Sequence, residues 1–298
     1  EEVDLSDNIN YMSGGVFKNC EKINKIKLPS NLEYLGNGIF SGTGITSITI
    51  PKTLERADRP LVGAEYLKEV ILEDGMQKIP SSTLSASYNE SIKVEKVQIP
   101  SSIKEIESSA FNKCIYLTEL NLGKNLEKVG KSAFYGCEGL KKVSFTGNDT
   151  NKLKIESMAF AFCTNLEKIT LSDNIYDIGG SAFVRCNKLK EIKLPLNLKF
   201  LGGSAFSGTG IKSITIPKTL ENGEYSLIGA EYLTEIIFEE GLKKIPSKMI
   251  NGVDYIQKIQ IPSSVKEIAD DAFQNCKNFT IYGYKNSYAE TYANENNI

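Results

Sequence analysis

Histidine is absent from the 298-residue chain. Its absence removes the usual general base, the commonest metal ligand and every catalytic triad that is built on imidazole. Apolar runs are also short, because none approaches the roughly 18 residues that a membrane-spanning helix needs, and residues 1–20 carry no signal-peptide pattern. We therefore expect no cofactor, no common type of hydrolase and no direct insertion of this segment into a membrane.

An excess of charge of either sign is missing too. The chain has 35 Lys and Arg residues against 37 Asp and Glu residues, and like charges do not gather into the blocks that are typical of basic arms. Proteins that bind phosphate backbones need such basic arms or patches. We therefore expect no nucleic acid partner, while the 41% of hydrophobic residues is enough to build a core.

One motif recurs along the whole chain. Residues 182–202 follow the pattern A-F-x-x-C-x-x-L-x-x-I-x-L-P-x-x-L-x-x-I-G, which returns with a period of 23 residues. We call the residue at the Phe position of the motif the anchor of its unit. The twelve anchors are Phe17, Phe40, Leu61, Leu84, Phe111, Phe134, Phe160, Phe183, Phe206, Leu227, Ile250 and Phe273. Their spacings of 21 to 27 residues fit leucine-rich repeats.

The I-x-L step of the motif predicts a short strand. Apolar and polar residues alternate there, as in Ile26/Leu28 and Ile192/Leu194, which is typical of a half-buried strand. Proline often follows, at the point where the chain has to leave the sheet. The predicted fold class is an α/β repeat protein, a leucine-rich-repeat solenoid with a parallel β-sheet of one short strand per 23-residue unit and a continuous core behind it.

A longer duplication lies on top of the short repeat. Residues 41–55, SGTGITSITIPKTLE, return as SGTGIKSITIPKTLE at 207–221, an offset of 166 residues or seven units. We predict one domain, a solenoid of about twelve units over residues 1–298. Two units carry extra residues, at 85–91 and 146–151, which we expect to form exposed loops.

The two ends of the chain differ. Residues 3–12 already match the strand and return half of a unit, so the sequence starts in mid-repeat without an N-terminal cap and we expect it to be a piece of a longer chain. Residues 281–298 are predicted to be the C-terminal cap and a natural end. Within them, Ser287 and Glu290 have capping-box spacing, which predicts a short helix through about Asn294.

The repeated motifs resemble a known family. A-F-x-x-C stands intact at 110–114, 133–137, 159–163, 182–186 and 272–276, together with L-x-x-I-x-L-P and I-G-x-x-A-F. This combination resembles the BspA-like bacterial leucine-rich repeats, as does the ending from residue 281. The resemblance implies a secreted or cell-surface bacterial protein, since some members are adhesins that bind host proteins or other bacteria. Four units depart from the pattern because they lack both Phe and Cys; their anchors are Leu61, Leu84, Leu227 and Ile250.

All six cysteines occupy one position of the repeat, three residues after the anchor. They are Cys20, Cys114, Cys137, Cys163, Cys186 and Cys276. Thr43, Thr209, Ala64 and Ala230 take the same position elsewhere, so the position requires a small buried side chain. Neighbouring cysteines between 114 and 186 are 23 to 26 residues apart, far from the spacing of zinc-binding pairs. We expect reduced, inward-facing thiols and no metal site.

Catalytic candidates are weak. The stretch 55–60, with Glu55 and Asp58, is the part least like the repeat and the best candidate for the paired carboxylates of a glycosidase, but a solvated turn explains it better. No serine lies in a nucleophile motif such as G-x-S-x-G. We therefore predict no catalytic residues.

The outward positions of the predicted strands form a mixed, hydrophilic ladder without Tyr or Phe. Its only apolar residues are Ile71 and Ile237, which we expect to be exposed. Each follows a glutamate two positions earlier and precedes one two positions later. The six candidate binding residues are Glu69, Ile71, Glu73, Glu235, Ile237 and Glu239. The two patches are seven units apart, about 34 Å at about 4.8 Å per strand, a separation suited to a bivalent or repetitive partner. Duplication alone accounts for the pair equally well.

These observations favour a non-enzymatic, secreted or cell-surface binding module that mediates protein–protein interaction or adhesion. Its partner is expected to be a protein or another cell-surface ligand. Two alternatives stay open. One is a structural spacer that displays a neighbouring domain, and the other is an enzyme, which the missing catalytic constellation disfavours.

Overall fold

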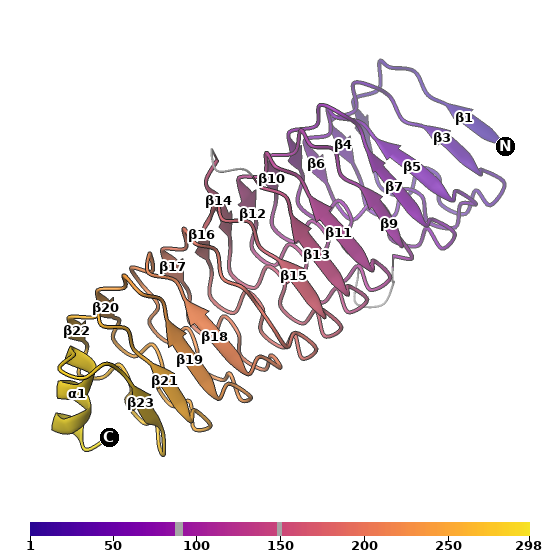
Figure 1. Ribbon diagram of the computed structural model, residues 1–298. Helices are drawn as coiled ribbons and strands as arrows, with labels where there is room; N and C mark the ends of the chain where they lie inside the picture. Colours follow the sequence, from indigo (N-terminus) through magenta and orange to yellow (C-terminus); the bar gives the residue numbers. More distant parts are fainter. Residues whose placement is uncertain (87–91, 148–150) are drawn as a thin grey trace.

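The repeats wind into an elongated solenoid with the two termini at opposite ends (Figure 1). The structure is a computed structural model that describes residues 1–86, 92–147 and 151–298. The central parts of the two insertions, at 87–91 and 148–150, lie outside the described residues. Ser85 and Ala86, which begin the first insertion, are buried, so the prediction of an exposed loop is wrong at those two positions.

The predicted strands line one long face, which we call the front face (Figure 1). All pairings between them are parallel and join the same position of successive units, for example Leu120 to Val143. The strands are β1 (Glu2–Asp4), β3 (Lys25–Lys27), β5 (Ser47–Ile50), β7 (Glu69–Leu72), β9 (Lys96–Gln98), β11 (Glu119–Leu122), β13 (Lys142–Phe145), β15 (Lys168–Thr170), β18 (Ser213–Ile216), β19 (Glu235–Phe238), β21 (Lys258–Gln260) and β23 (Thr280–Tyr282). The predicted alternation is confirmed, since inward residues such as Ile48 are buried and outward ones such as Thr49 are exposed.

A second ladder of short strands, which the sequence analysis did not predict, runs along the opposite edge of the solenoid; we call it the rear edge (Figure 1). Its strands are β2 (Tyr11–Met12), β4 (Tyr34–Leu35), β6 (Arg56–Ala57), β8 (Lys78–Ile79), β10 (Glu105–Ile106), β12 (Lys128–Val129), β14 (Leu153–Ile155), β16 (Ile175–Ile178), β17 (Phe200–Leu201), β20 (Lys244–Ile245) and β22 (Glu267–Ile268). Most of them have two residues, one outward and one buried. Each unit therefore contributes to two parallel ladders.

Both ladders break at the two shortest units, which span 40–61 and 206–227. On the front face β5 pairs with β7 but not with β3, and on the rear edge β6 pairs with β4 but not with β8. The second short unit repeats this arrangement. There β18 pairs only with β19, and Asn222 bridges back to Phe200 but not forward to β20.

Missing residues explain the breaks. The regular turn from the cysteine position to the next core residue contains two residues, but Gly44 and Gly210 stand alone in the short units. Both glycines are needed, because a Cβ would lie 2.8 Å from the Glu21 carbonyl oxygen at Gly44 and 2.9 Å from that of Asn187 at Gly210. The shortened turn displaces the strand that follows from the preceding one. The strand predicted at 191–194 lies next to such a break and is not formed, although Leu194 is buried.

The core behind the ladders is filled by the anchors and by the Leu and Ile positions of the motif. Eleven anchors are buried and Phe17, in the first unit, is half-buried. Phe111, Phe134, Phe160, Phe183 and Phe206 form a column of stacked rings, with centroids 4.8 to 5.8 Å apart. Offset stacks at such distances stabilise a core beyond the area that they bury.

The C-terminal end is closed by α1 (Tyr288–Asn296), as predicted, and β23 extends the front ladder to residue 282. Ala289 and Tyr292 pack on the last turn, and the Tyr292 ring lies edge-on to Phe273 at 5.6 Å. The predicted capping box is wrong in detail. Ser287 makes no side-chain hydrogen bond, and the Glu290 carboxylate instead accepts one from the Asn286 N–H at 2.6 Å.

Candidate functional site

The structure brings each predicted triplet of candidate residues together on the front face. Glu69 and Ile71 occupy the two outward positions of β7, and Ile71 lies between Thr49 of β5 and Gln98 of β9. Glu235 and Ile237 hold the same places on β19, where Ile237 lies between Thr215 and Gln260. Both isoleucines are half-buried, so the expectation that they are exposed is wrong; their strand neighbours cover part of each side chain.

The first glutamate of each triplet orders the next strand. Glu69 forms an ion pair with Lys96 at 2.7 Å and accepts a hydrogen bond from the Gln98 amide at 2.8 Å. These two interactions lower the pKa of Glu69.

Glu235 repeats the arrangement of Glu69. It pairs with Lys258 at 2.8 Å and accepts hydrogen bonds from Gln260 at 2.7 Å and Ser213 at 3.1 Å. Contacts with Lys258 and then Gln260 lower its pKa. Each isoleucine therefore lies beside a glutamine whose side-chain amide is already held in place.

The last glutamate of each triplet braces a turn. The Glu73 carboxylate accepts a hydrogen bond from the Lys52 N–H at 2.8 Å, and Glu239 accepts one from the Lys218 N–H at the same distance. All four glutamates thus have partners inside the solenoid. The isoleucines and the polar side chains around them are the parts of the two patches that can contact a partner.

The front ladder also carries an aromatic residue that the sequence analysis excluded. Tyr282 follows Ile237 and Gln260 in the outward row and is 53% exposed. The Lys258 ammonium lies 5.1 Å from the centre of its ring. The row was missed because residues 280–282 were assigned to the cap and not to the ladder.

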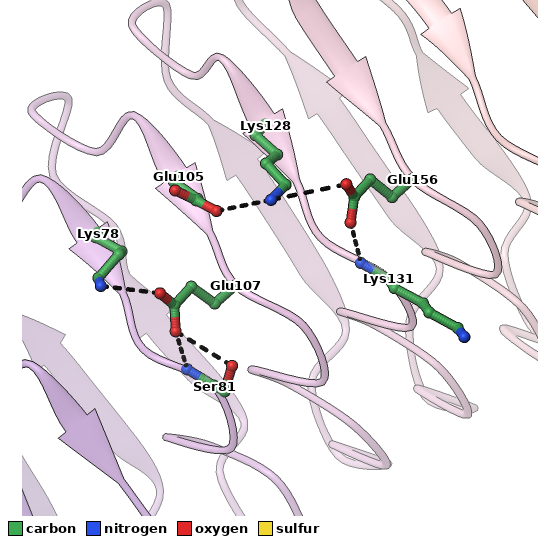
Figure 2. Close-up of polar contacts among 7 residues, drawn as sticks. All are labelled: Lys78, Ser81, Glu105, Glu107, Lys128, Lys131 and Glu156. Atoms are coloured by element: carbon green, nitrogen blue, oxygen red, sulfur yellow. Dashed lines mark hydrogen bonds and ion pairs between the residues drawn. The ribbon is translucent and has the colours of Figure 1, made fainter.

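The rear edge presents a row of alternating charges in its central part. Figure 2 shows Lys128 between two glutamates, 3.0 Å from Glu105 and 3.7 Å from Glu156. One turn earlier, Lys78 lies 2.9 Å from Glu107. Burial acts to raise the pKa of Glu107, but the contacts with Lys78 and Ser81 outweigh it and hold the pKa below its usual value.

Two of these glutamates also bind the backbone of the preceding unit (Figure 2). Glu107 accepts hydrogen bonds from both the N–H of Ser81, at 2.9 Å, and its hydroxyl, at 3.2 Å. Glu156 accepts one from the Lys131 N–H at 3.0 Å. The carboxylate therefore joins a lysine and a turn N–H, which fixes one unit against the next.

Aromatic residues begin the rear edge at its N-terminal end. The rings of Tyr11 and Tyr34 are stacked with centroids 4.6 Å apart, and the Arg56 guanidinium lies 5.6 Å from the centre of Tyr34. The sequence analysis missed this group because it considered the outward positions of the front ladder alone.

The cysteines have structural contacts and are all free. Four are fully buried, and their thiols donate to the carbonyl of the anchor in the preceding unit, as Cys137 does to Phe111 at 3.0 Å. Burial is the main cause that raises the pKa of the Cys163 thiol, which disfavours the reactive thiolate. Cys20 and Cys276, near the two ends, are half-buried, so the inward-facing prediction holds fully only for the central four.

The described residues contain no cluster of His, Cys, Asp or Glu suited to a metal ion. Within the same residues, no helix has the length and apolar character to cross a membrane. The front face and the rear edge are thus the two surfaces on which a function has to be sought.

The repeat pattern and the solenoid together define a class of protein, the leucine-rich repeats. A family model for the BspA type leucine-rich repeat region matches residues 1–94, 62–152, 82–183 and 153–280, and the chain belongs to this family. The search of curated proteins found no match.

Solved structures agree with this fold. The pneumococcal vaccine antigen PcpA is 18% identical, with a TM-score of 0.51 and coverage of 95% of this chain and 79% of that chain. A leucine-rich cell surface protein from Faecalibacterium prausnitzii is 21% identical, with a TM-score of 0.39 and coverage of 97% and 80%. A leucine-rich repeat protein from Bacteroides ovatus is 18% identical, with a TM-score of 0.48 and coverage of 95% and 84%.

Proposed function

We propose that this protein is a non-enzymatic binding module, displayed on a cell surface or secreted, which mediates protein–protein interaction or adhesion through its front face. Family membership supports a leucine-rich repeat with a binding role, and the likeness to a pneumococcal antigen agrees with a surface location. The proposal is an inference for this chain.

The observation that carries the proposal is the pair of matching patches on the front face. Ile71 and Ile237 each expose part of an apolar side chain beside a glutamine amide that an ion-paired glutamate holds in place. Ordered side chains lose less conformational entropy when they bind than free ones do. Two such patches, seven units apart, would give a repetitive partner an avidity that neither patch has alone.

The test starts with a partner. Immobilised protein is incubated with host extracellular proteins and with bacterial surface proteins, and captured candidates are purified for affinity measurements by biolayer interferometry. Ile71→Ser and Ile237→Ser are each expected to weaken binding, and the double variant is expected to weaken it more than either. Thr49→Ser and Thr215→Ser, which alter the neighbouring outward positions, are the matched controls.

Stability has to be measured alongside. Half-burial of one isoleucine accounts for about 1 kcal/mol, so urea unfolding of each variant should change by no more than that. Unchanged affinity in the folded double variant would refute the front-face proposal. Failure to capture any partner would favour the alternative of a structural spacer.

A further inference from the structure

The rear edge contains a cavity at the break that follows the second short unit. Its volume is about 620 Å³, and it opens between Asn222 and β20, where the ladder is not paired. The charged residues of its lining are Lys199, Lys218, Glu221, Glu224, Lys243 and Lys244. Four lysines against two glutamates leave a local net charge of +2, although the whole chain carries −2.

The same tetrapeptide borders the corresponding break in the first copy. Lys78-Ile-Pro-Ser81 returns as Lys244-Ile-Pro-Ser247. In the first copy, the Glu107 carboxylate fills the place between Lys78 and Ser81, where it meets one ammonium, one N–H and one hydroxyl (Figure 2). This peptide conformation therefore binds a carboxylate through three donors.

In the second copy that carboxylate is replaced by Ala269, at the position that matches Glu107. Lys244 turns to Glu267 instead, at 2.7 Å. Among the described residues, no hydrogen bond involves the N–H or the hydroxyl of Ser247, which lines the cavity together with Ala269. The donors of Ser247 thus remain, while the acceptor that satisfies their counterparts in the first copy is gone.

Other differences between the copies point the same way. Glu33 and Gln77 of the first copy are matched by Lys199 and Lys243 in the second. At the positions matching the cavity lining, the first copy carries three basic and four acidic residues, so the second copy is the more positive by three charges. Such a change favours an anion that comes from outside the chain.

We propose that this cavity binds an oxyanion, a carboxylate in the geometry that Glu107 shows, through the Ser247 N–H and hydroxyl and the surrounding lysines. A charge-assisted hydrogen bond from an ammonium is about twice as strong as a neutral one, which favours a carboxylate or phosphate group over a neutral ligand. The anion is either free in solution or carried by an acidic side chain of a partner.

The experiment uses the ¹⁵N-labelled full chain and follows the Ser247 amide resonance. Three probes are added: sodium acetate, sodium phosphate and a hexaglutamate peptide, with a glycine–serine hexapeptide as the neutral control. Saturable shifts are expected with the anionic probes. A response to the small anions indicates a free ligand, while a response to hexaglutamate at much lower concentration indicates an acidic segment of a partner.

Two variants test the assignment in opposite directions. Ala269→Glu should supply the missing carboxylate, weaken probe binding at least tenfold and raise the melting temperature; Ala269 is half-buried at the rim, so the longer side chain has room. Glu107→Ala should create an anion-dependent shift at Ser81, which the unmodified chain lacks.

Absence of a saturable shift at Ser247 would overturn the proposal, as would unchanged binding in Ala269→Glu. Since Ile71 and Ile237 lie on the front face, their variants should leave this binding unaffected, and failure of the front-face function can be told apart from failure of this one.

Discussion

The column of phenylalanine rings provides the sharpest test of how the solenoid is held together. Phe160 is fully buried and stacks on Phe134 at 5.0 Å and on Phe183 at 5.5 Å, while Phe145 meets it edge-on at 6.1 Å. Leucine is an accepted anchor in this chain, for example at Leu61, so Phe160→Leu keeps the apolar position and removes the ring contacts.

The expected cost follows from these contacts. Aromatic pairs contribute about 0.5–1.5 kcal/mol each beyond area burial, and two stacked pairs are lost, so Phe160→Leu should cost about 2 kcal/mol. Phe160→Ala should cost about 5 kcal/mol, since it also leaves a cavity. Phe17 is the matched control, because it is half-buried and has one partner ring, Phe40, at 6.3 Å. Phe17→Leu should therefore cost less than about 1 kcal/mol.

Urea unfolding followed by far-UV circular dichroism gives these free energies, and a double-mutant cycle isolates the ring contact. Phe134→Leu with Phe160→Leu should show a coupling of about 0.5–1.5 kcal/mol. Phe134→Leu with Phe206→Leu should show almost none, because two anchors lie between them and units contact only their neighbours. Equal coupling in the two pairs, or a cost at Phe160 no larger than at Phe17, would refute the argument.

Three further predictions concern groups whose contacts are defined. Thiol labelling of denatured, unreduced protein should find six thiols, whereas the native protein should react only at Cys20 and Cys276; four or fewer thiols after denaturation would contradict the absence of disulfides. Glu107 has a lowered pKa, so its ion pair stabilises the fold above the ordinary glutamate pKa of 4.5 and the stabilisation is lost as the pH falls through the lowered value. Glu107→Gln should thus cost no more than about 1 kcal/mol at neutral pH and nothing in acid, as measured by urea unfolding at both pH values. Ser287→Ala should leave the melting temperature nearly unchanged, because the buried Ser287 hydroxyl has no partner among the described residues, while Glu290→Ala should lower it.

The front ladder could be predicted because its signal is repeated and strong. Each unit shows two inward apolar residues separated by one polar residue, and period-two alternation of this kind is specific for a half-buried strand. The rear ladder could not be found in this way. A strand of two residues, such as Lys78–Ile79, contains a single apolar residue and therefore no alternation that would distinguish it from a turn.

The six candidate residues were correctly grouped, but their surroundings were not predictable. The contacts of Glu69 come from Lys96 and Gln98, which lie 27 and 29 residues later in the chain. Only the parallel register brings these side chains together, and register depends on the length of every intervening turn. For the same reason the sequence did not reveal that Ile71 is half-buried by its neighbours.

Unit length, more than residue type, determines where the solenoid is open. Each short unit has one residue fewer before its front strand and one fewer before the next anchor, as the seven-residue step from Leu54 to Leu61 shows against the eight from Leu32 to Phe40. The first omission breaks the front ladder on the N-terminal side, and the second breaks the rear edge on the C-terminal side. Both copies of the duplication share these breaks because they share the omissions. What differs between the copies is the charge of the residues at the rear break, so the backbone supplies the opening and a few substitutions decide what it can bind.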